Sequence, residues 1–249
     1  MGINSQGVLY GQFKGGAWTK ISMEGAGALQ SVSVGDGKII GVTKSNEIYY
    51  RMGINARNPF GTSWEFMKGK ASRVTVGDGK IMAVQPDGLI LYRLGVTAFR
   101  PYGTRWSTLL GRAKQISIGG GRIMSVRDDR SVWYRDGITA TRSGGMGTEW
   151  KRLEGASLTQ ISCKNGQIFG VGGSGEIMYR TGMTGSASAS GSFGSGWSSL
   201  GGKLSKVTYT GDKILGLTAA GSLATRPLEM DGKRLKCDGP SLPCLGGKG

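Results

Sequence analysis

Tyrosine followed by arginine is the recurring pair of side chains that can bind a ligand. It stands at Tyr50-Arg51, and an arginine returns at the matching place in each later repeat: Arg93, Arg135, Arg180 and Arg226. Arginine presents a planar fork of donors that suits anionic and polar groups, beside an aromatic surface that attracts cations. The pair can therefore mark a set of equivalent ligand sites. It can equally be structural, with the aromatic ring packed between elements and the arginine solvated or stacked, and the sequence leaves both readings open.

Catalytic and metal-binding patterns are not found. The chain has no histidine, which removes the commonest general base and the commonest neutral metal ligand. Its three cysteines and its turn aspartates have no metal-ligand spacing. Gly35-Asp36-Gly37 and Gly77-Asp78-Gly79 are interpreted as hairpin turns rather than calcium loops. We expect a protein that is not an enzyme and that needs no metal or cofactor.

The net charge of the chain narrows the classes of partner that it can bind. The 249 residues carry a formal net charge of +16, a field that favours polyanions such as nucleic acid, acidic lipid or charged glycans. No nucleic-acid partner is expected, because stacking platforms with interleaved Lys and Arg are not evident. No apolar stretch approaches the ~18 residues of a membrane span. The N-terminus lacks the features of a signal peptide, so a secreted protein would have lost its signal already.

Five tryptophans reveal an internal repeat. They are separated by 46, 42, 44 and 47 residues, and each follows a small glycine turn: Trp18, Trp64, Trp106, Trp150 and Trp197. After each tryptophan come an alternating β-rich segment, a glycine-rich turn, a second apolar segment such as 39–42, and a closing segment such as 48–51. Short alternating blocks bounded by Gly, Asp or Asn are typical of antiparallel strands in tight hairpins.

Four strands in about 45 residues predict one blade of a β-propeller. Residues 1–10 match the last two strands of a blade, and 233–242 echo the first two. We therefore predict an all-β, six-bladed β-propeller of four-stranded antiparallel blades, with the last blade closed by N- and C-terminal strands together. Five blades and a tail are the alternative. The prediction is one domain, 1–249, with blades near 13–51, 60–93, 102–135, 146–180, 193–226, and 227–249 plus 1–12.

The cysteines bear on whether the protein works in an oxidising or a reducing compartment. In the joined blade, Cys237 and Cys244 fall on adjacent strands, where a disulfide would indicate an oxidising environment. Two free thiols in a cytosolic protein are the alternative. Cys163 occupies a strand position and is expected to fill the core rather than to react.

The long connections between each Tyr-Arg pair and the next tryptophan are natural binding loops, because loops on a rigid scaffold usually carry function. Each ends on an apolar residue that we expect to anchor it. On the closing strand, Tyr49 and Arg51 share one face. The candidate ligand-binding residues, expected in grooves between blades, are Tyr49, Arg51, Asn55, Asn58, Trp64, Arg93, Trp106, Trp133, Arg135, Trp150 and Arg180.

The segment Tyr50-Arg51-Met52-Gly53-Ile54-Asn55, with Asn58-Pro59-Phe60-Gly61-Thr62-Ser63-Trp64 after it, resembles the tectonin repeat. So do residues 115–119 and 48–51, and the resemblance covers nearly the whole chain. The family includes fish-egg lectins, a horseshoe-crab lipopolysaccharide-binding lectin, and fungal and slime-mould tectonins. The chain departs from the pattern at Thr225, which replaces the tyrosine, and in the last blade, where tryptophan and arginine are both missing.

The resemblance implies a secreted, multivalent lectin of innate defence that recognises surface glycans or lipopolysaccharide. Several weak sites on one ring would give avidity for a repetitive surface. Fewer than six sites would be competent, those bordered by blades one to four. The alternative is a cytoplasmic tectonin-type adaptor that binds acidic lipid or a protein partner. The sequence leaves the sugar and the oligomeric state open.

Overall fold

The computed structural model describes residues 1–13, 15–138, 145–183, 193–228, 230–231 and 234–235. All regular structure in this part of the chain is β-strand, in agreement with the predicted all-β class. The residues group into two compact units, one built from residues 1–116 and the other from residue 117 onward. The prediction of one domain over 1–249 stays a prediction.

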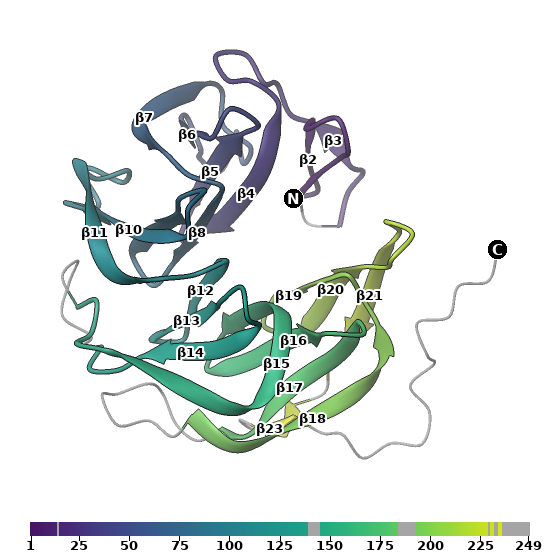
Figure 1. The fold of residues 1–249 in the computed structure, drawn as a ribbon. Coiled ribbons are helices and arrows are strands. Elements are labelled where there is room, and N and C mark those ends of the chain that lie inside the picture. Colours follow the sequence, from purple (N-terminus) through teal and green to yellow (C-terminus); the bar gives the residue numbers. More distant parts are fainter. Residues whose placement is uncertain (14, 139–144, 184–192, 229, 232–233, 236–249) are drawn as a thin grey trace. The chain divides into compact units, whose positions relative to one another are not determined.

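The first unit contains three antiparallel sheets (Figure 1). The N-terminal sheet has the strands β1 (Gly2–Ile3), β2 (Leu9–Gly11) and β3 (Thr19–Lys20). The second sheet has β4 (Leu29–Gly35), β5 (Lys38–Thr43), β6 (Glu47–Arg51) and β7 (Trp64–Lys70). The third has β8 (Arg73–Gly77), β9 (Lys80–Val84), β10 (Leu89–Leu94) and β11 (Arg105–Arg112).

The second unit repeats the same pattern. It begins within β12 (Gln115–Gly119), which is followed by β13 (Arg122–Val126), β14 (Ser131–Arg135) and the long strand β15 (Trp150–Lys164). The first half of β15 pairs with β14 and its second half with β16, so two sheets share one strand. The remaining strands are β16 (Gln167–Gly172), β17 (Glu176–Met183), β18 (Phe193–Lys203), β19 (Lys206–Tyr209), β20 (Lys213–Leu217), β21 (Leu223–Pro227), β22 (Met230–Asp231) and β23 (Arg234–Leu235).

The predicted strands form, but the predicted blade boundaries are wrong by one strand. The tryptophan strand β7 pairs with the preceding strand β6, with Arg51 opposite Trp64. Each tryptophan strand thus closes the sheet before it and does not open the next one, so the second sheet runs from 29 to 70 where the prediction placed a blade at 13–51. The reason is that a tandem repeat reads the same from any starting strand. Only the pairing of strands distinguishes the starting points.

The same shift changes the two ends of the chain. The N-terminus supplies three strands to its sheet, β1 to β3, where two were predicted. Near the C-terminus, the described strands β22 and β23 pair with each other. The predicted strand closure by the rest of the C-terminal segment, and the Cys237–Cys244 pairing, lie outside the described residues.

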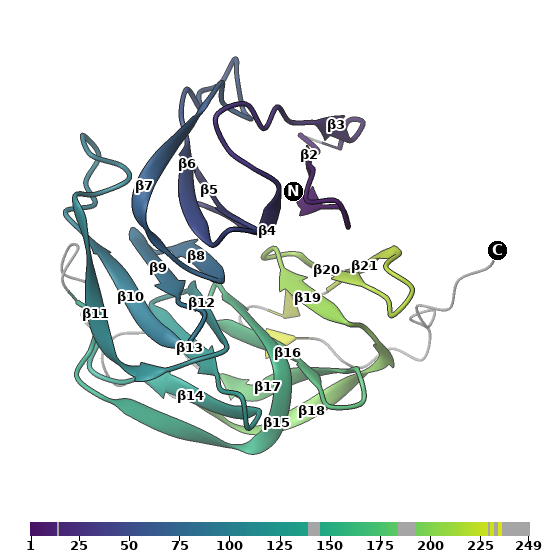
Figure 2. The ribbon, with the colours of Figure 1, turned by 45° about the horizontal axis from the view of Figure 1, so that its top comes forward.

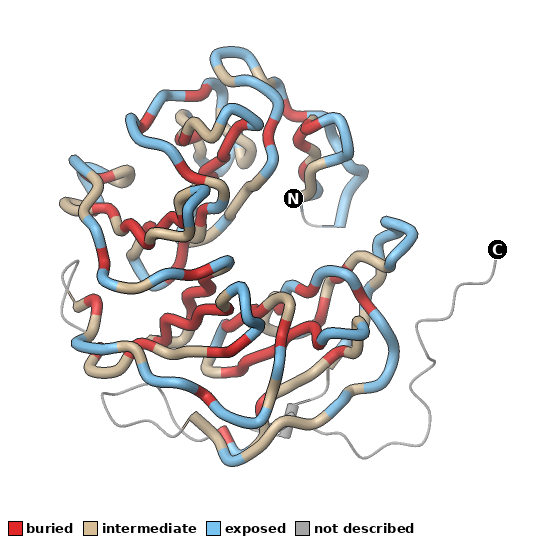
Figure 3. The backbone as a smooth tube through the Cα atoms, in the orientation of Figure 1, coloured by how far each residue is buried: buried red, intermediate tan, exposed pale blue. Residues whose placement is uncertain are grey.

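Apolar clusters fill the space between neighbouring sheets. In the first unit, Ile40 and Ile48 of the second sheet share a cluster with Val76 and Ile81 of the third. These two sheets lie side by side (Figure 2), and buried residues, red in Figure 3, concentrate in middle strands such as β5 and β9, while the outer strands β7 and β11 are mostly exposed or half-buried. The inner strands are also tied by hydrogen bonds, because the amide of Val76 donates to Oγ of Ser33 at 3.0 Å. In the second unit, Cys163 is buried in the core, as predicted.

The hairpin interpretation of the Gly-Asp-Gly segments is confirmed. Asp36 and Gly37 have φ of 50° and 69°, and Asp78 and Gly79 have φ of 49° and 70°. Positive φ at both central residues is the requirement of the tight turn that joins twisted antiparallel strands. Oδ2 of Asp36 also accepts a hydrogen bond from the amide of Gly79, at 2.7 Å, so consecutive turns are linked.

Candidate functional site

The repeated arginines lie on the closing strands and are buried. Arg51, Arg93, Arg135 and Arg180 are between 3% and 8% exposed. In each, Nε donates to the carbonyl of the apolar residue that ends the following loop, at 2.7–2.9 Å; the acceptors are Phe60, Tyr102, Met146 and Phe193. The arginines therefore hold the loops against their sheets, and these contacts favour the structural reading of the Tyr-Arg pair.

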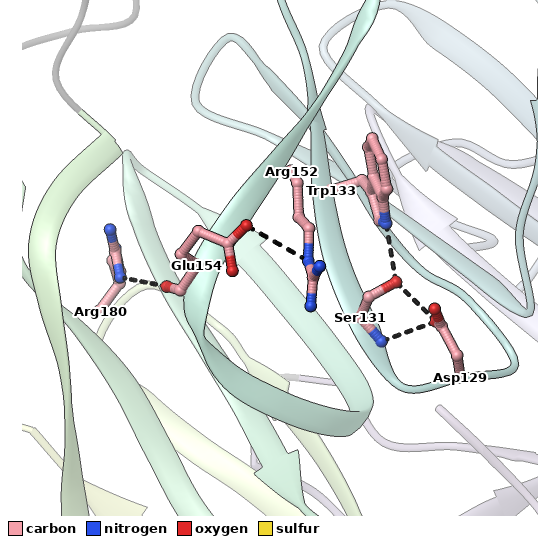
Figure 4. Close-up of polar contacts among 6 residues, drawn as sticks. All are labelled: Asp129, Ser131, Trp133, Arg152, Glu154 and Arg180. Carbon is pink, nitrogen blue, oxygen red and sulfur yellow. Dashed lines mark hydrogen bonds and ion pairs between the residues drawn. The ribbon is translucent and has the colours of Figure 1, made fainter.

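Two of these arginines donate hydrogen bonds from all three of their side-chain nitrogens. Nη1 of Arg51 donates to the carbonyl of Ser22 at 3.1 Å, and Nη2 donates to that of Gly61 at 3.3 Å. Arg180 makes the corresponding bonds to the carbonyls of Glu154 and Gly194, at 3.2 and 3.1 Å, and Figure 4 shows the first of them. Glu154 lies in β15, the outer strand of the preceding sheet, and Ser22 follows just after β3, so each arginine ties its loop to the preceding sheet or to the segment that leaves it.

Each arginine lies over the tryptophan that its strand faces. The guanidinium carbon is 5.2 Å from the ring centre for Arg51 over Trp64 and for Arg93 over Trp106, and 5.4–5.6 Å in the two later pairs, Arg135 over Trp150 and Arg180 over Trp197. Such stacking attracts a cation to the ring face. Burial lowers the pKa of all four guanidinium groups from the ordinary value. Arginine nevertheless stays protonated in proteins, so these positive charges are permanent.

The indoles complete the tie between sheets. Nε1 of Trp64 donates to the Ser22 carbonyl at 3.1 Å, the same oxygen that Arg51 contacts. Nε1 of Trp106 donates to the Lys68 carbonyl at 2.7 Å. Ser22 and Lys68 stand at equivalent places, four residues after Trp18 and Trp64. The outer strand of one sheet thus accepts the tryptophan of the next.

A glycine makes this close approach possible. Gly69 follows Trp64 by five residues, has φ of +103°, and a Cβ there would lie 3.0 Å from Cδ1 of Trp106. The same spacing recurs at Gly111, Gly155 and Gly202. Sequence analysis missed this position, although the pattern of tryptophan, an apolar residue at the third place after it and glycine at the fifth was present in four repeats.

A cavity of about 400 Å³ opens where β7 and β11 meet in the first unit. It contains two of the predicted site residues, Arg93 and Trp106. Its other lining residues were not predicted: Phe66, Met67, Lys68, Gly69, Thr104 and Arg105. Phe66 is 48% exposed, and Lys68 and Arg105 are also exposed. An aromatic surface beside a few polar and charged groups is the usual composition of a small-ligand site.

The remaining predicted residues do not gather in this cavity. Asn55 and Asn58 shape the loop after β6, because Oδ1 of Asn55 accepts the amides of Arg57 and Asn58 at 2.9 Å. Tyr49 packs on Phe66 with ring centres 5.5 Å apart. Trp133 lies in the second unit, where its Nε1 donates to Oγ of Ser131 at 2.7 Å (Figure 4).

The missing arginine of the predicted sixth blade is replaced by a glutamine. Nε2 of Gln12 donates to the carbonyl of Gly16 at 2.7 Å, which ties down the short connection before Trp18. Since Trp18 directly precedes β3, the N-terminal sheet does have its tryptophan, contrary to the prediction. The error follows from the shifted blade boundaries.

Two further observations concern chemistry and membranes. Within the described residues, no group of three or more Asp, Glu or Cys side chains is placed to hold a metal ion. A search of the same residues found no helix with the length and apolar character of a membrane span.

Comparison with solved structures places the fold among β-propellers. Human WBSCR16 matches with a TM-score of 0.56 at 12% identity, over 85% of this chain and 65% of that one. Yeast RCC1 (Prp20), solved with Kap60 bound, gives 0.55 at 12%, over 85% of this chain and 60% of that one. YCF48 bound to D1 peptide gives 0.53 at 14%, over 90% and 73%. This chain thus spans less than two thirds of the first two, and such low identity indicates the fold alone.

Sequence comparison is more specific. No curated protein matches the chain significantly. The profile of the Tectonin domain, however, matches residues 1–114 and again residues 108–234. Together the two matches cover nearly every repeat of tryptophan, buried arginine and glycine turn described above. The chain therefore belongs to the tectonin family.

Proposed function

We propose that this tectonin-domain protein is a multivalent lectin that binds surface glycans and acts by recognition rather than catalysis. The observation that carries the proposal is the cavity between β7 and β11, which combines an exposed aromatic ring, Phe66, with the indole of Trp106 and with cationic donors. Aromatic faces with nearby fixed donors suit a sugar, which has apolar ring faces and polar edges.

Because its contacts recur, the repeat supports several ligand sites of the same construction along the chain. The buried arginine, the stacked tryptophan and the outer strand of the preceding sheet recur in both units, at Arg51 and Arg180 as well as at Arg93. Several weak sites carried by one chain gain avidity against a repetitive surface. Lipopolysaccharide is the ligand we propose first, because its phosphates suit a chain of net charge +16.

The proposal includes a closed, six-bladed ring and secretion into an extracellular setting of innate defence. The N-terminal sheet has three strands, and a fourth strand from the C-terminal segment would complete it. Removal of residues 236–249 tests this closure. If that segment supplies the strand, the truncated chain unfolds at lower urea concentration; an unchanged midpoint would favour five blades and a tail.

Binding to immobilised lipopolysaccharide and to a glycan panel, at low and moderate salt, tests the lectin proposal. A lectin binds at both salt concentrations and is displaced by a free simple sugar. Trp106→Ala should weaken this binding, whereas Lys80→Ala, at the start of β9 and outside the cavity lining, serves as a charge control. Binding that disappears with salt and ignores free sugar would mean that only the net charge is recognised, and would overturn the lectin.

A second candidate is an adaptor that binds an acidic lipid surface, and one observation favours it. Phe99 is 97% exposed on the loop between β10 and β11, with the exposed Arg100 beside it. The loop is held in shape, because the amide of Arg100 donates to Oγ1 of Thr97 at 3.0 Å. An aromatic tip with an adjacent cation suits a membrane interface. Sedimentation with anionic vesicles, lost in Phe99→Ala and retained in Leu110→Ala, would favour this function.

A further inference from the structure

Arg93 differs from the other well-anchored arginines in its hydrogen bonds. Arg51 and Arg180 each use Nε, Nη1 and Nη2 to bind main-chain carbonyls. Arg93 uses only Nε, which donates to the Tyr102 carbonyl at 2.8 Å. Among the residues that the structure describes, Nη1 and Nη2 of Arg93 have no acceptor. The residue is nevertheless only 8% exposed, and it lines the cavity.

The carbonyl of Lys68 is bonded differently from its counterpart in the first pair. By the repeat, the acceptor for Nη1 of Arg93 should be the Lys68 carbonyl, as the Ser22 carbonyl is for Arg51. In the first pair the Ser22 oxygen accepts both the arginine and the tryptophan, at 3.1 Å each. At Lys68 the indole takes the oxygen at 2.7 Å. Arg93 lines the cavity, and its terminal nitrogens make no hydrogen bond to the described residues.

The charge around the cavity has one sign. Lys68 and Arg105 line it together with Arg93, and none of its eight lining residues is acidic. The equivalent place in the second unit is different, because the residue matching Lys68 is Glu154, whose carboxylate is 3.4 Å from Nε of Arg152 (Figure 4). There, all three side-chain nitrogens of Arg180 donate to main-chain carbonyls. The two places therefore share a backbone plan but not a charge.

We propose that the cavity between β7 and β11 is an anion site that selects a phosphate or sulfate ester on a sugar, with Nη1 and Nη2 of Arg93 as its bidentate donors. Arginine and a tetrahedral oxyanion form paired hydrogen bonds of this kind. Lys68 and Arg105 add positive charge at the mouth, and Phe66 and Trp106 offer apolar surface to the sugar ring. The inference rests on the proposed lectin function and deepens it: the repeated sites are chemically different from one another.

The experiment titrates ¹⁵N-labelled protein with glucosamine 6-phosphate, with glucosamine 6-sulfate and with unmodified glucosamine. The reporters are the NMR signals of the Trp106 indole N–H and of the Arg93 Nε–H, assigned from the spectra of Trp106→Phe and Arg93→Lys. Both esters should shift the two signals, and the unmodified sugar should need at least about tenfold higher concentration. A response to one ester alone identifies which oxyanion is the natural one.

Variants that leave the buried contacts intact separate binding from folding. Lys68→Glu should raise the dissociation constant for the phosphate ester about tenfold or more, because it introduces a carboxylate at the mouth. The matched variant Arg152→Gln, in the second unit, should leave it unchanged. Equal affinity in Lys68→Glu and the parent protein, or equal response to charged and neutral sugar, would overturn the anion site.

The outcome also separates this inference from the lectin itself. If glycans bind and compete but the ester leaves the Trp106 and Arg93 signals unshifted, the anion site is wrong and the lectin stands. If inorganic phosphate and the ester shift both signals while no glycan surface binds, the anion site stands and the lectin proposal is wrong.

Discussion

Nε of Arg51 donates to the carbonyl oxygen of Phe60 at 2.8 Å, across the loop that joins β6 to β7. With two further bonds from the same guanidinium, this contact fixes the loop, its own sheet and the sheet before it. A permanently charged group that donates to three main-chain carbonyls from three separate places in the chain holds those places together as a clamp.

The first prediction compares two arginines. Arg51→Ala should lower the free energy of unfolding by about 3–4 kcal/mol, since it removes three partly buried hydrogen bonds from a charged group to main-chain carbonyls. Arg93→Ala should lower the free energy of unfolding by clearly less, because it removes one hydrogen bond to a carbonyl instead of three. Urea unfolding measures both. Equal losses would mean that the number of carbonyl bonds does not set the contribution of these arginines.

Conservative replacement sharpens the comparison. Arg51→Lys should recover only part of the lost stability, because an ammonium group cannot reproduce the planar fork that contacts Phe60, Ser22 and Gly61 together. A lysine variant as stable as the parent would show that positive charge alone is sufficient.

The second prediction concerns two glycines with similar backbone conformations. Gly61 and Gly79 have φ of +67° and +70°. A Cβ at Gly61 would lie 2.3 Å from the Met52 carbonyl oxygen, whereas a Cβ at Gly79 meets nothing within 4 Å. Gly79→Ala should cost about 1–2 kcal/mol from backbone conformation. Gly61→Ala should cost at least about 2 kcal/mol more, or prevent folding. Thermal unfolding of the pair decides, and similar melting temperatures would refute the steric argument.

The third prediction tests the bond between inner strands. Ser33→Ala removes the acceptor of the Val76 amide and should cost about 1 kcal/mol. Hydrogen exchange at Val76 should become faster, while exchange at Cys163, whose amide donates to Oγ of Ser117 at 2.9 Å, should not change. Unchanged exchange at Val76 would show that neighbouring packing alone protects this amide.

The fourth prediction is a pH dependence in the second unit. The pKa of Asp129 is held below its ordinary value of 3.8, chiefly because Oγ of Ser131 donates to its carboxylate at 2.5 Å. A lowered pKa in the folded state adds stability that is present above pH 3.8 and is lost as the pH falls through the lowered value. Ser131→Ala should therefore raise the pKa of Asp129 toward 3.8 and weaken this acid dependence.

A ¹³C NMR titration of the Asp129 carboxylate measures the change. Ser174→Ala is the matched control, because Ser174 lowers the pKa of Glu176 in the same way at the corresponding turn. An unchanged Asp129 pKa in Ser131→Ala would contradict the assignment of the shift to this hydroxyl.

The sequence was sufficient for the strands but not for the way they combine. Alternation and glycine turns place segments such as 39–42 and 48–51 correctly, because each signal is local. The partner of Trp64 depends on contacts across a long loop, and a periodic sequence carries no mark of where a sheet begins. The bond from Arg51 to Ser22 spans 29 residues, so sequence alone left the structural and ligand-binding roles of the arginine undecided.

The candidate site shows the same division. Trp106 and Arg93 stand out because they recur. Phe66, Lys68 and Arg105 escape notice because they occupy positions where the repeats differ, and variation between repeats looks like ordinary surface. Their importance follows from the hydrogen bonds of Arg93, which donates to one main-chain carbonyl where Arg51 donates to three.

The offset between repeat and sheet decides where the chain can be divided. A fragment that stops just before Trp64 follows the sequence repeat, yet it leaves the edge of β6 open to pairing with other molecules. A fragment that stops after Lys70 keeps β4 to β7 as one complete sheet. Truncations, circular permutants and fusions of this protein should therefore be cut between β7 and β8, where a break falls in a short linker and leaves every pairing of strands intact.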